Sequence, residues 1–111
     1  MEQTLRRSHE KSSKRSYSDL DALKKDVMKL VLNEKYVILW NHIKRDHPNI
    51  TEQEIINGLY YGMLKPDKKI KARFVSWSKF TISARLIRIV FEIHETSENK
   101  FVLVITAFDE D

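Results

Sequence analysis

The spacing of apolar residues changes once along this chain, from a helical period in its first half to a period of two in its second. Between residues 18 and 33, apolar side chains recur three and four residues apart, at Leu20, Leu23, Val27, Leu30 and Val31. This spacing predicts an amphipathic helix. Ser18 followed by Asp21 resembles a capping box, which predicts that the helix begins near Ser18. Its apolar side must be covered, either by the chain's own sheet or by another protein or a second copy.

The segment 36–46 begins with an apolar run and continues into a polar one. Both a strand entering a short helix and one continuous helix fit this pattern. We predict a single helix from about Val37 to Asp46, since Pro48 cannot easily continue a helix and marks its end.

The helix that follows has the clearest start signal in the chain. Thr51 and Glu54 stand three residues apart, as in a capping box. Gly62 is a suitable C-terminal stop. Gly58, in the middle of this helix, costs about 1 kcal/mol relative to alanine, which predicts close packing against it.

From residue 69 onward, apolar and polar residues alternate. The alternation predicts strands over 71–80, 85–94 and 101–108, with a loop over 95–100. The last strand is apolar on both faces, as expected for a strand in the centre of a sheet or one covered by helices. Helices followed by strands indicate an α+β fold, with N-terminal helices packed on a three- to four-stranded antiparallel sheet.

Composition places the chain among small globular domains. It has 111 residues, no cysteine and a net charge of +4. Residues 1–16 hold five cations and two anions, a net of +3, and show no periodicity. We therefore expect a basic flexible tail over 1–16 and a single α+β domain over 17–111. The tail could add affinity for RNA, bind an acidic partner or simply be solvated. Without cysteines, a signal peptide or an apolar run of about 20 residues, we expect a cytoplasmic protein without a membrane span.

The strand over 85–94 carries the most informative polar residues. Arg88, Glu92 and His94 share one face, while the alternate face is apolar. Cleavage of RNA by its own 2′-hydroxyl needs a base, charge stabilisation at the phosphorane and a proton for the 5′-oxygen. Either Glu92 or His94 could be the base and the other the acid, with Arg88 contacting phosphate. An ordinary solvated strand face, with Arg88 paired to Glu92, has the same pattern.

His42, on the preceding helix, is a further catalytic candidate, although a histidine on a helix surface is the more common case. Trp77 could stack on a base beside two cations of its strand, or belong to the core. The candidate RNA-binding residues are Arg45, Arg73, Trp77, Lys79 and Arg85.

Over residues 40–111 the chain resembles the RelE/BrnT-like superfamily of small bacterial ribonuclease toxins. The resemblance rests on four short stretches: His42 and Arg45, Ile50-Thr51 leading to Glu54-Ile55, the arginine-bearing strand 85–91, and the terminal strand 102–108. It implies a metal-independent endoribonuclease without a cofactor, acting on RNA that is free or on the ribosome, and neutralised by a cognate antitoxin. The helix at 18–33 and the basic tail lie outside the shared unit.

Two hypotheses follow, and they differ in where the exposed features should lie. A ribonuclease toxin should have a basic surface over the 85–94 strand. A non-catalytic interaction module of the same shape, such as an immunity, antitoxin-like or phage-encoded inhibitor protein, should expose an apolar patch along the 18–33 helix. The four histidines are scattered and match no zinc pattern, so we expect no metal site. The sequence leaves the oligomeric state open.

Overall fold

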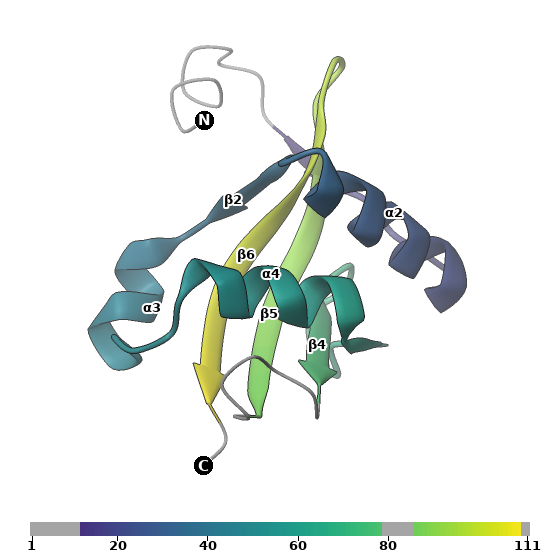
Figure 1. Ribbon diagram of the computed structural model, residues 1–111. Helices are drawn as coiled ribbons and strands as arrows, with labels where there is room; N and C mark the ends of the chain where they lie inside the picture. The colour runs from purple at the N-terminus through teal and green to yellow at the C-terminus, as the bar shows by residue number, and fades with distance from the viewer. Residues whose placement is uncertain (1–11, 79–85, 110–111) are drawn as a thin grey trace.

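The computed structural model describes residues 12–78 and 86–109. Within these ranges the chain forms three helices and six strands, which confirms the α+β class (Figure 1). In chain order they are β1 (Ser13–Lys14), α2 (Leu20–Leu32), β2 (Tyr36–Ile38), α3 (Trp40–Asp46), α4 (Glu52–Tyr61), β3 (Met63–Pro66), β4 (Phe74–Ser78), β5 (Ile87–Glu95) and β6 (Lys100–Asp109).

The sheet is larger than the sequence predicted, and it is mixed rather than antiparallel. Its strand order is β2-β6-β5-β4-β3, and β1 pairs with β5 as well. The pairs β3–β4, β4–β5 and β5–β6 are antiparallel, whereas β2 runs parallel to β6. Because β4 pairs with β5 only as far as Phe91, β1 takes the same side of β5 further along, opposite His94 and Glu95.

The prediction of one helix over 37–46 is wrong, since this segment divides into β2 and α3. The backbone of β2 follows β6, with Val102 N donating to Lys35 O at 3.0 Å and Leu39 N donating to Val104 O at 3.1 Å. The β-branched Val37 lies opposite Leu103. β6 is apolar on both faces and offers a free edge, so pairing with it satisfies backbone groups that a helix would otherwise satisfy.

The start of α2 differs by one residue from the prediction. Asp19, rather than Ser18, is the N-cap, and its carboxylate accepts a hydrogen bond from Asp21 N at 2.9 Å. Aspartate is as good an N-cap as serine, and its charge also favours the helix N-terminus.

The predicted features of α4 are confirmed. Thr51 and Glu54 form the capping box, and Gly62 is the C-cap. Gly58 faces the fully buried Ile89 of β5, and a β-carbon added at Gly58 would collide with the Ile89 side chain. The helix therefore lies unusually close to the sheet at this point.

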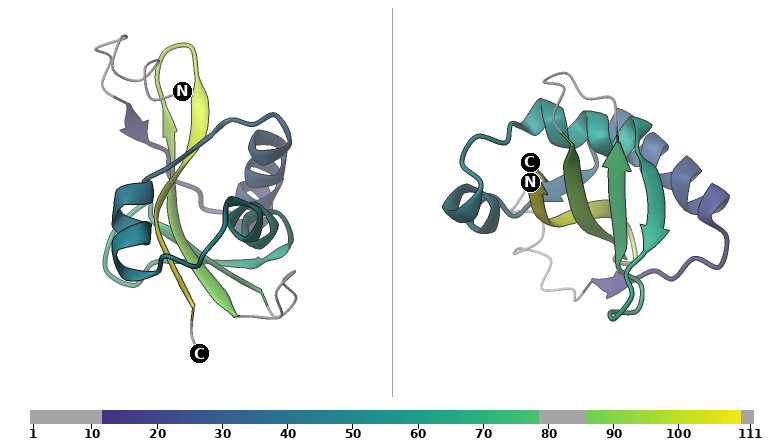
Figure 2. Two further views of the ribbon diagram at one scale, coloured as in Figure 1. Left: turned by 60° about the vertical axis from the view of Figure 1, so that its left-hand side comes forward. Right: turned by 90° about the horizontal axis from the view of Figure 1, so that it is seen from below.

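One face of the sheet carries the core. α2 and α4 lie together on this face (Figure 2), over the four alternate apolar residues of β5, Ile87, Ile89, Phe91 and Ile93. We call the opposite side of the sheet the open face; it bears Arg73, Val75, Trp77, Arg88, Val90, Glu92 and His94. Within the ranges that the structure describes, no helix is long and apolar enough to cross a membrane.

Candidate functional site

A buried carboxylate surrounded by donors lies at one end of the open face. Glu92 is only 3% exposed. Its Oε2 accepts from Arg73 Nε at 2.8 Å and contacts Lys14 Nζ at 3.1 Å, while its Oε1 lies 2.8 Å from His94 Nε2. On the far side of the imidazole, His94 Nδ1 lies 2.7 Å from the hydroxyl oxygen of Ser12. We call Ser12, Lys14, Arg73, Glu92 and His94 the Glu92 cluster.

Strand geometry brings the cluster together from three parts of the chain. Glu92 and His94 are two residues apart on β5, so their side chains emerge on the same face, about 6–7 Å apart along the strand. Lys14 of β1 is the direct cross-strand partner of His94. Arg73 comes from the turn before β4, where Ala72 has a φ of 58°, in the left-handed region. Such a backbone costs about 1–2 kcal/mol for a residue other than glycine, so packing must hold this turn in place.

The charge of Glu92 determines which ring nitrogen of His94 carries the hydrogen. Burial alone would raise the pKa of Glu92, but the hydrogen bonds from His94, Arg73 and Lys14 outweigh burial and hold that pKa below its usual value. An ionised carboxylate can only accept hydrogen bonds, so His94 Nε2 must be the protonated nitrogen. In the neutral imidazole, Nδ1 is then the basic atom, and it faces the hydroxyl of Ser12.

The imidazole of His94 is held on its face as well as at its edges. Its ring stacks on Phe101 of β6, with centroids 5.9 Å apart and planes 29° apart. The His94 side chain is 13% exposed, so only a small part of the ring is accessible to solvent. A histidine held in this way has a fixed tautomer and a fixed orientation, both of which proton transfer requires.

The structure places the predicted Glu92 and His94 in direct contact, while Arg88 lies at a distance. Arg88 stands on the open face four residues from Glu92, about 13 Å along the strand. There it forms a cross-strand row with Trp77 of β4 and Phe108 of β6. The open face therefore has two polar regions, the Glu92 cluster and the row at Arg88.

The structure does not bring His42 or Arg45 to the Glu92 cluster. Both are exposed on α3, where Arg45 Nε lies 3.5 Å from Asp46 Oδ1. α3 ends beside the far end of β6, with the rings of His47 and Phe108 6.1 Å apart. The other candidates, Lys79 and Arg85, lie outside the described residues.

Ser12 and Lys14 are members of the cluster that sequence reasoning missed. The sequence places both in the basic segment 1–16, where we expected a flexible tail. In the structure, Ser13 and Lys14 pair with β5, and Arg15 N donates to Ile93 O at 2.8 Å. A strand of two residues is too short to show a period, so no pattern in the sequence could have revealed it.

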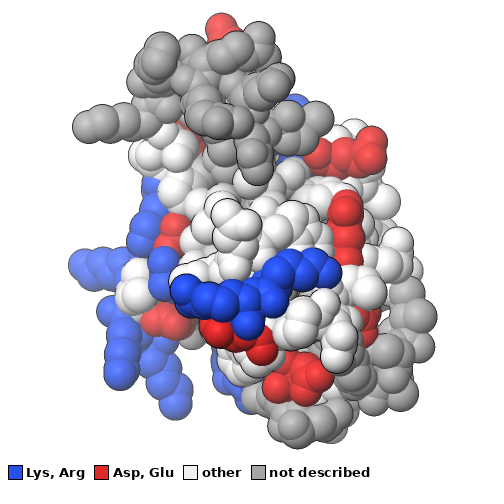
Figure 3. Space-filling view, turned by 90° about the vertical axis from the view of Figure 1, so that its left-hand side faces the viewer, with Lys and Arg blue, Asp and Glu red and all other residues white. Residues whose placement is uncertain are grey.

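Charge is unevenly distributed around the molecule. Figure 3 shows the side on which α3 lies, with the open face toward the left; Lys and Arg gather along that left edge and also cross the centre, while Asp and Glu lie mainly over the centre and right. The strand register adds Lys65, opposite Val75, to the cations of the open face. A polyanion would therefore meet attractive charge on this face.

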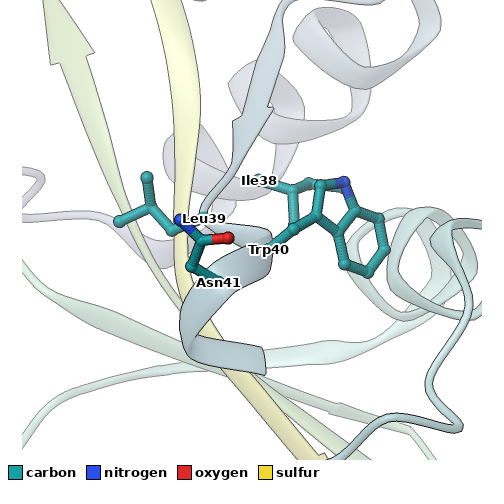
Figure 4. A pocket seen from close by; sticks show the side chains of 4 residues that line it. All are labelled: Ile38, Leu39, Trp40 and Asn41. Atoms are coloured by element: carbon teal, nitrogen blue, oxygen red, sulfur yellow. The ribbon is translucent and has the colours of Figure 1, made fainter. Parts of the chain in front are cut away.

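A small pocket lies where β2 joins α3. Ile38, Leu39, Trp40 and Asn41 line it (Figure 4). None of these side chains can exchange a proton near neutral pH, so the pocket offers no acid or base. Among the described residues, no group of three or more His, Cys, Asp or Glu is placed to hold a metal ion.

Comparison with protein-family models, curated proteins and solved structures finds no match for this chain. The Glu92 cluster must therefore be interpreted from its own chemistry.

Proposed function

We propose that this protein is a metal-independent endoribonuclease that cleaves RNA by attack of the 2′-hydroxyl, with the Glu92 cluster as its centre. One observation carries the proposal: His94 is fixed by a buried, ionised Glu92 so that its basic Nδ1 faces a hydroxyl group. In this proposal the ribose 2′-hydroxyl replaces the Ser12 hydroxyl at Nδ1, and the base then takes its proton.

Glu92 has a different role from the one we expected from the sequence. A carboxylate whose pKa is held below its usual value and which binds Arg73 and Lys14 is a weak base and cannot be an acid near neutral pH. In this proposal Glu92 orients His94 and stabilises the imidazolium that forms when Nδ1 takes the proton. His94 is the general base.

Two cations stand beside this base. The Arg73 side chain is 23% exposed and that of Lys14 is 38% exposed, so both can reach solvent while contacting Glu92. The remaining guanidinium hydrogens of Arg73 suit a phosphate oxygen of the developing phosphorane. In-line attack sends the 5′-oxygen out on the side of the phosphorus away from His94, where solvent supplies its proton.

The row at Arg88 would bind RNA away from the point of cleavage. It lies six residues from His94 along β5, about 20 Å, which corresponds to a few nucleotides of an extended strand. Trp77 could stack on an unpaired base there, and Arg88 could contact the adjoining phosphate. This arrangement favours single-stranded RNA, whose bases are free to stack.

The test is cleavage of a short single-stranded RNA by the purified full-length protein in the presence of a metal chelator. We expect products ending in a 2′,3′-cyclic phosphate. His94→Gln should lower the rate by about 100-fold or more, the usual contribution of a general base. The matched variant His42→Gln should keep the wild-type rate, since His42 is exposed on α3.

Three outcomes would count against the proposal. Equal loss in the His42 and His94 variants would place the site elsewhere, as would full activity in both. Intact RNA with correctly folded wild-type protein would favour the alternative, a non-catalytic interaction module. That alternative has little support from α2, whose exposed leucines, Leu20 and Leu32, are the first and last residues of the helix rather than one patch.

A further inference from the structure

The hydroxyl of Ser12 is itself bound to a fixed base. Its oxygen lies 2.7 Å from His94 Nδ1, and His94 Nε2 lies 2.8 Å from Glu92 Oε1. Because the ionised Glu92 requires the hydrogen on Nε2, the Ser12 O–H must donate to Nδ1 whenever His94 is neutral. A hydroxyl, a base and a buried carboxylate thus stand in a line, in the order that activates a serine nucleophile.

We propose that Ser12 is an activated nucleophile, able to form a covalent bond with phosphonyl and related phosphoryl centres. This inference goes beyond the ribonuclease proposal, because it concerns the protein's own hydroxyl and requires no RNA. The arrangement differs from the familiar serine triads in using Nδ1 toward the serine and Nε2 toward the acid, but the roles of the three groups are the same.

The reaction balances with the groups present. The Ser12 oxygen attacks phosphorus, its proton passes to His94 Nδ1, and the Oγ–P bond forms as the bond from phosphorus to the leaving group breaks. With a fluorophosphonate, fluoride leaves and a phosphonyl-serine remains. Lys14 and Arg73 contact Glu92 Oε2, at the other end of this line from Ser12, and their charge keeps Glu92 ionised, so that it can stabilise the imidazolium that forms.

The chain contains a matched control for Ser12 at the next position. Ser13 is exposed and lies opposite Glu95, the neighbour of His94 on the other face of β5. The two serines are neighbours in sequence, and Ser12 is half-buried whereas Ser13 is exposed, so access to solvent alone would favour labelling of Ser13. Ser12 contacts the imidazole of His94, and a preference for Ser12 would therefore be attributed to that contact rather than to exposure.

The experiment treats the full-length protein with a fluorophosphonate and locates the adduct by peptide mapping in a mass spectrometer. We expect modification of Ser12 at a rate about 100-fold above that of Ser13, the usual effect of a positioned base. His94→Gln should remove the difference between the two serines. Glu92→Gln should reduce it, because a neutral amide stabilises the imidazolium less than a carboxylate does. Circular dichroism of each variant checks that the fold remains.

Equal labelling of Ser12 and Ser13 in the wild-type protein would overturn the proposal, and so would the absence of labelling at both. This comparison needs no variant, so a variant that fails to fold leaves the result valid. Labelling that persists at Ser12 in a folded His94→Gln protein would also overturn it. Since no RNA is present, a negative result here leaves the ribonuclease test unaffected.

Discussion

At the scale of single residues, Glu92 organises the site by its charge. Burial of a carboxylate is unfavourable unless donors compensate for lost water, and here Arg73, Lys14 and His94 do so. The sequence predicted that Glu92 and His94 share one strand face, because side chains two residues apart on a strand point to the same side. It left open which of them is the base, because that depends on Arg73 and Lys14, and neither is adjacent to Glu92 in sequence.

Glu92→Gln should destabilise the protein by about 2 kcal/mol at neutral pH, because Arg73 and Lys14 would then face each other without an anion. Both cations are partly exposed, which keeps the cost below that of a fully buried ion pair. Urea denaturation of the two proteins measures the difference. Glutamine has nearly the same size as glutamate, so lost packing cannot account for it.

The same variant has a predicted pH dependence. The pKa of Glu92 lies below its usual value of 4.5 in the folded protein, so the unfolded chain binds more protons as the pH falls. The stability contributed by the Glu92 charge is therefore present above about pH 4.5 and is lost as the pH falls through the lower folded-state pKa. The difference in free energy of unfolding between wild type and Glu92→Gln should therefore be smaller at pH 3 than at neutral pH. An unchanged difference would show that the charge of Glu92 is not its cause.

At the scale of elements, local signals were reliable and long-range pairing was not. The capping box of α4 and its end at Gly62 depend on residues within or next to the helix, and both were predicted. β2 was missed because three apolar residues before a helix also fit a helix, and its partner β6 begins more than 60 residues later. β3 was missed because it is a short edge strand that ends in Pro66, where a missing N–H is tolerated.

Lys24 joins two elements, and its removal should weaken their contact. Its Nζ donates to the carbonyls of Leu59, Tyr60 and Gly62, at 3.1, 2.6 and 2.8 Å, and so caps the C-terminal end of α4 from α2. Lys24→Met keeps most of the apolar stem but removes the donor. We expect a loss of about 1–2 kcal/mol in the free energy of unfolding.

Lys25→Met is the matched control, since Lys25 is the exposed neighbour on the same helix. It should change stability by less than about 0.5 kcal/mol. Thermal or urea unfolding measures the stability of both variants. Equal losses in the free energy of unfolding would mean that the carbonyl contacts of Lys24 contribute little.

At the scale of the whole molecule, the site is assembled from segments that are far apart in the chain. Ser12 and Lys14 come from the N-terminal segment, Arg73 from the turn before β4, and Glu92 and His94 from β5. Only Glu92 and His94 lie close enough in sequence for the alternation of a single strand to predict that they meet. The others meet because β1 and the turn before β4 lie against the same part of β5, a consequence of strand pairing that sequence periodicity does not encode.

This assembly predicts that the N-terminal segment is part of the site rather than an accessory. A chain lacking residues 1–11 retains Ser12 and Lys14, whereas one lacking residues 1–15 loses both, together with the pairing of β1 with β5. The longer truncation should lower the rate of RNA cleavage by at least 10-fold, because Glu92 loses a cation and phosphate loses Lys14. The shorter truncation should stay within about threefold of the full-length rate, its loss being limited to the long-range attraction of the removed charges for RNA.

Assays of both truncations at two salt concentrations separate the two effects, since long-range attraction weakens with salt and the direct contacts of Lys14 weaken less. If both truncations lose activity equally, and only at low salt, β1 acts merely as a source of charge.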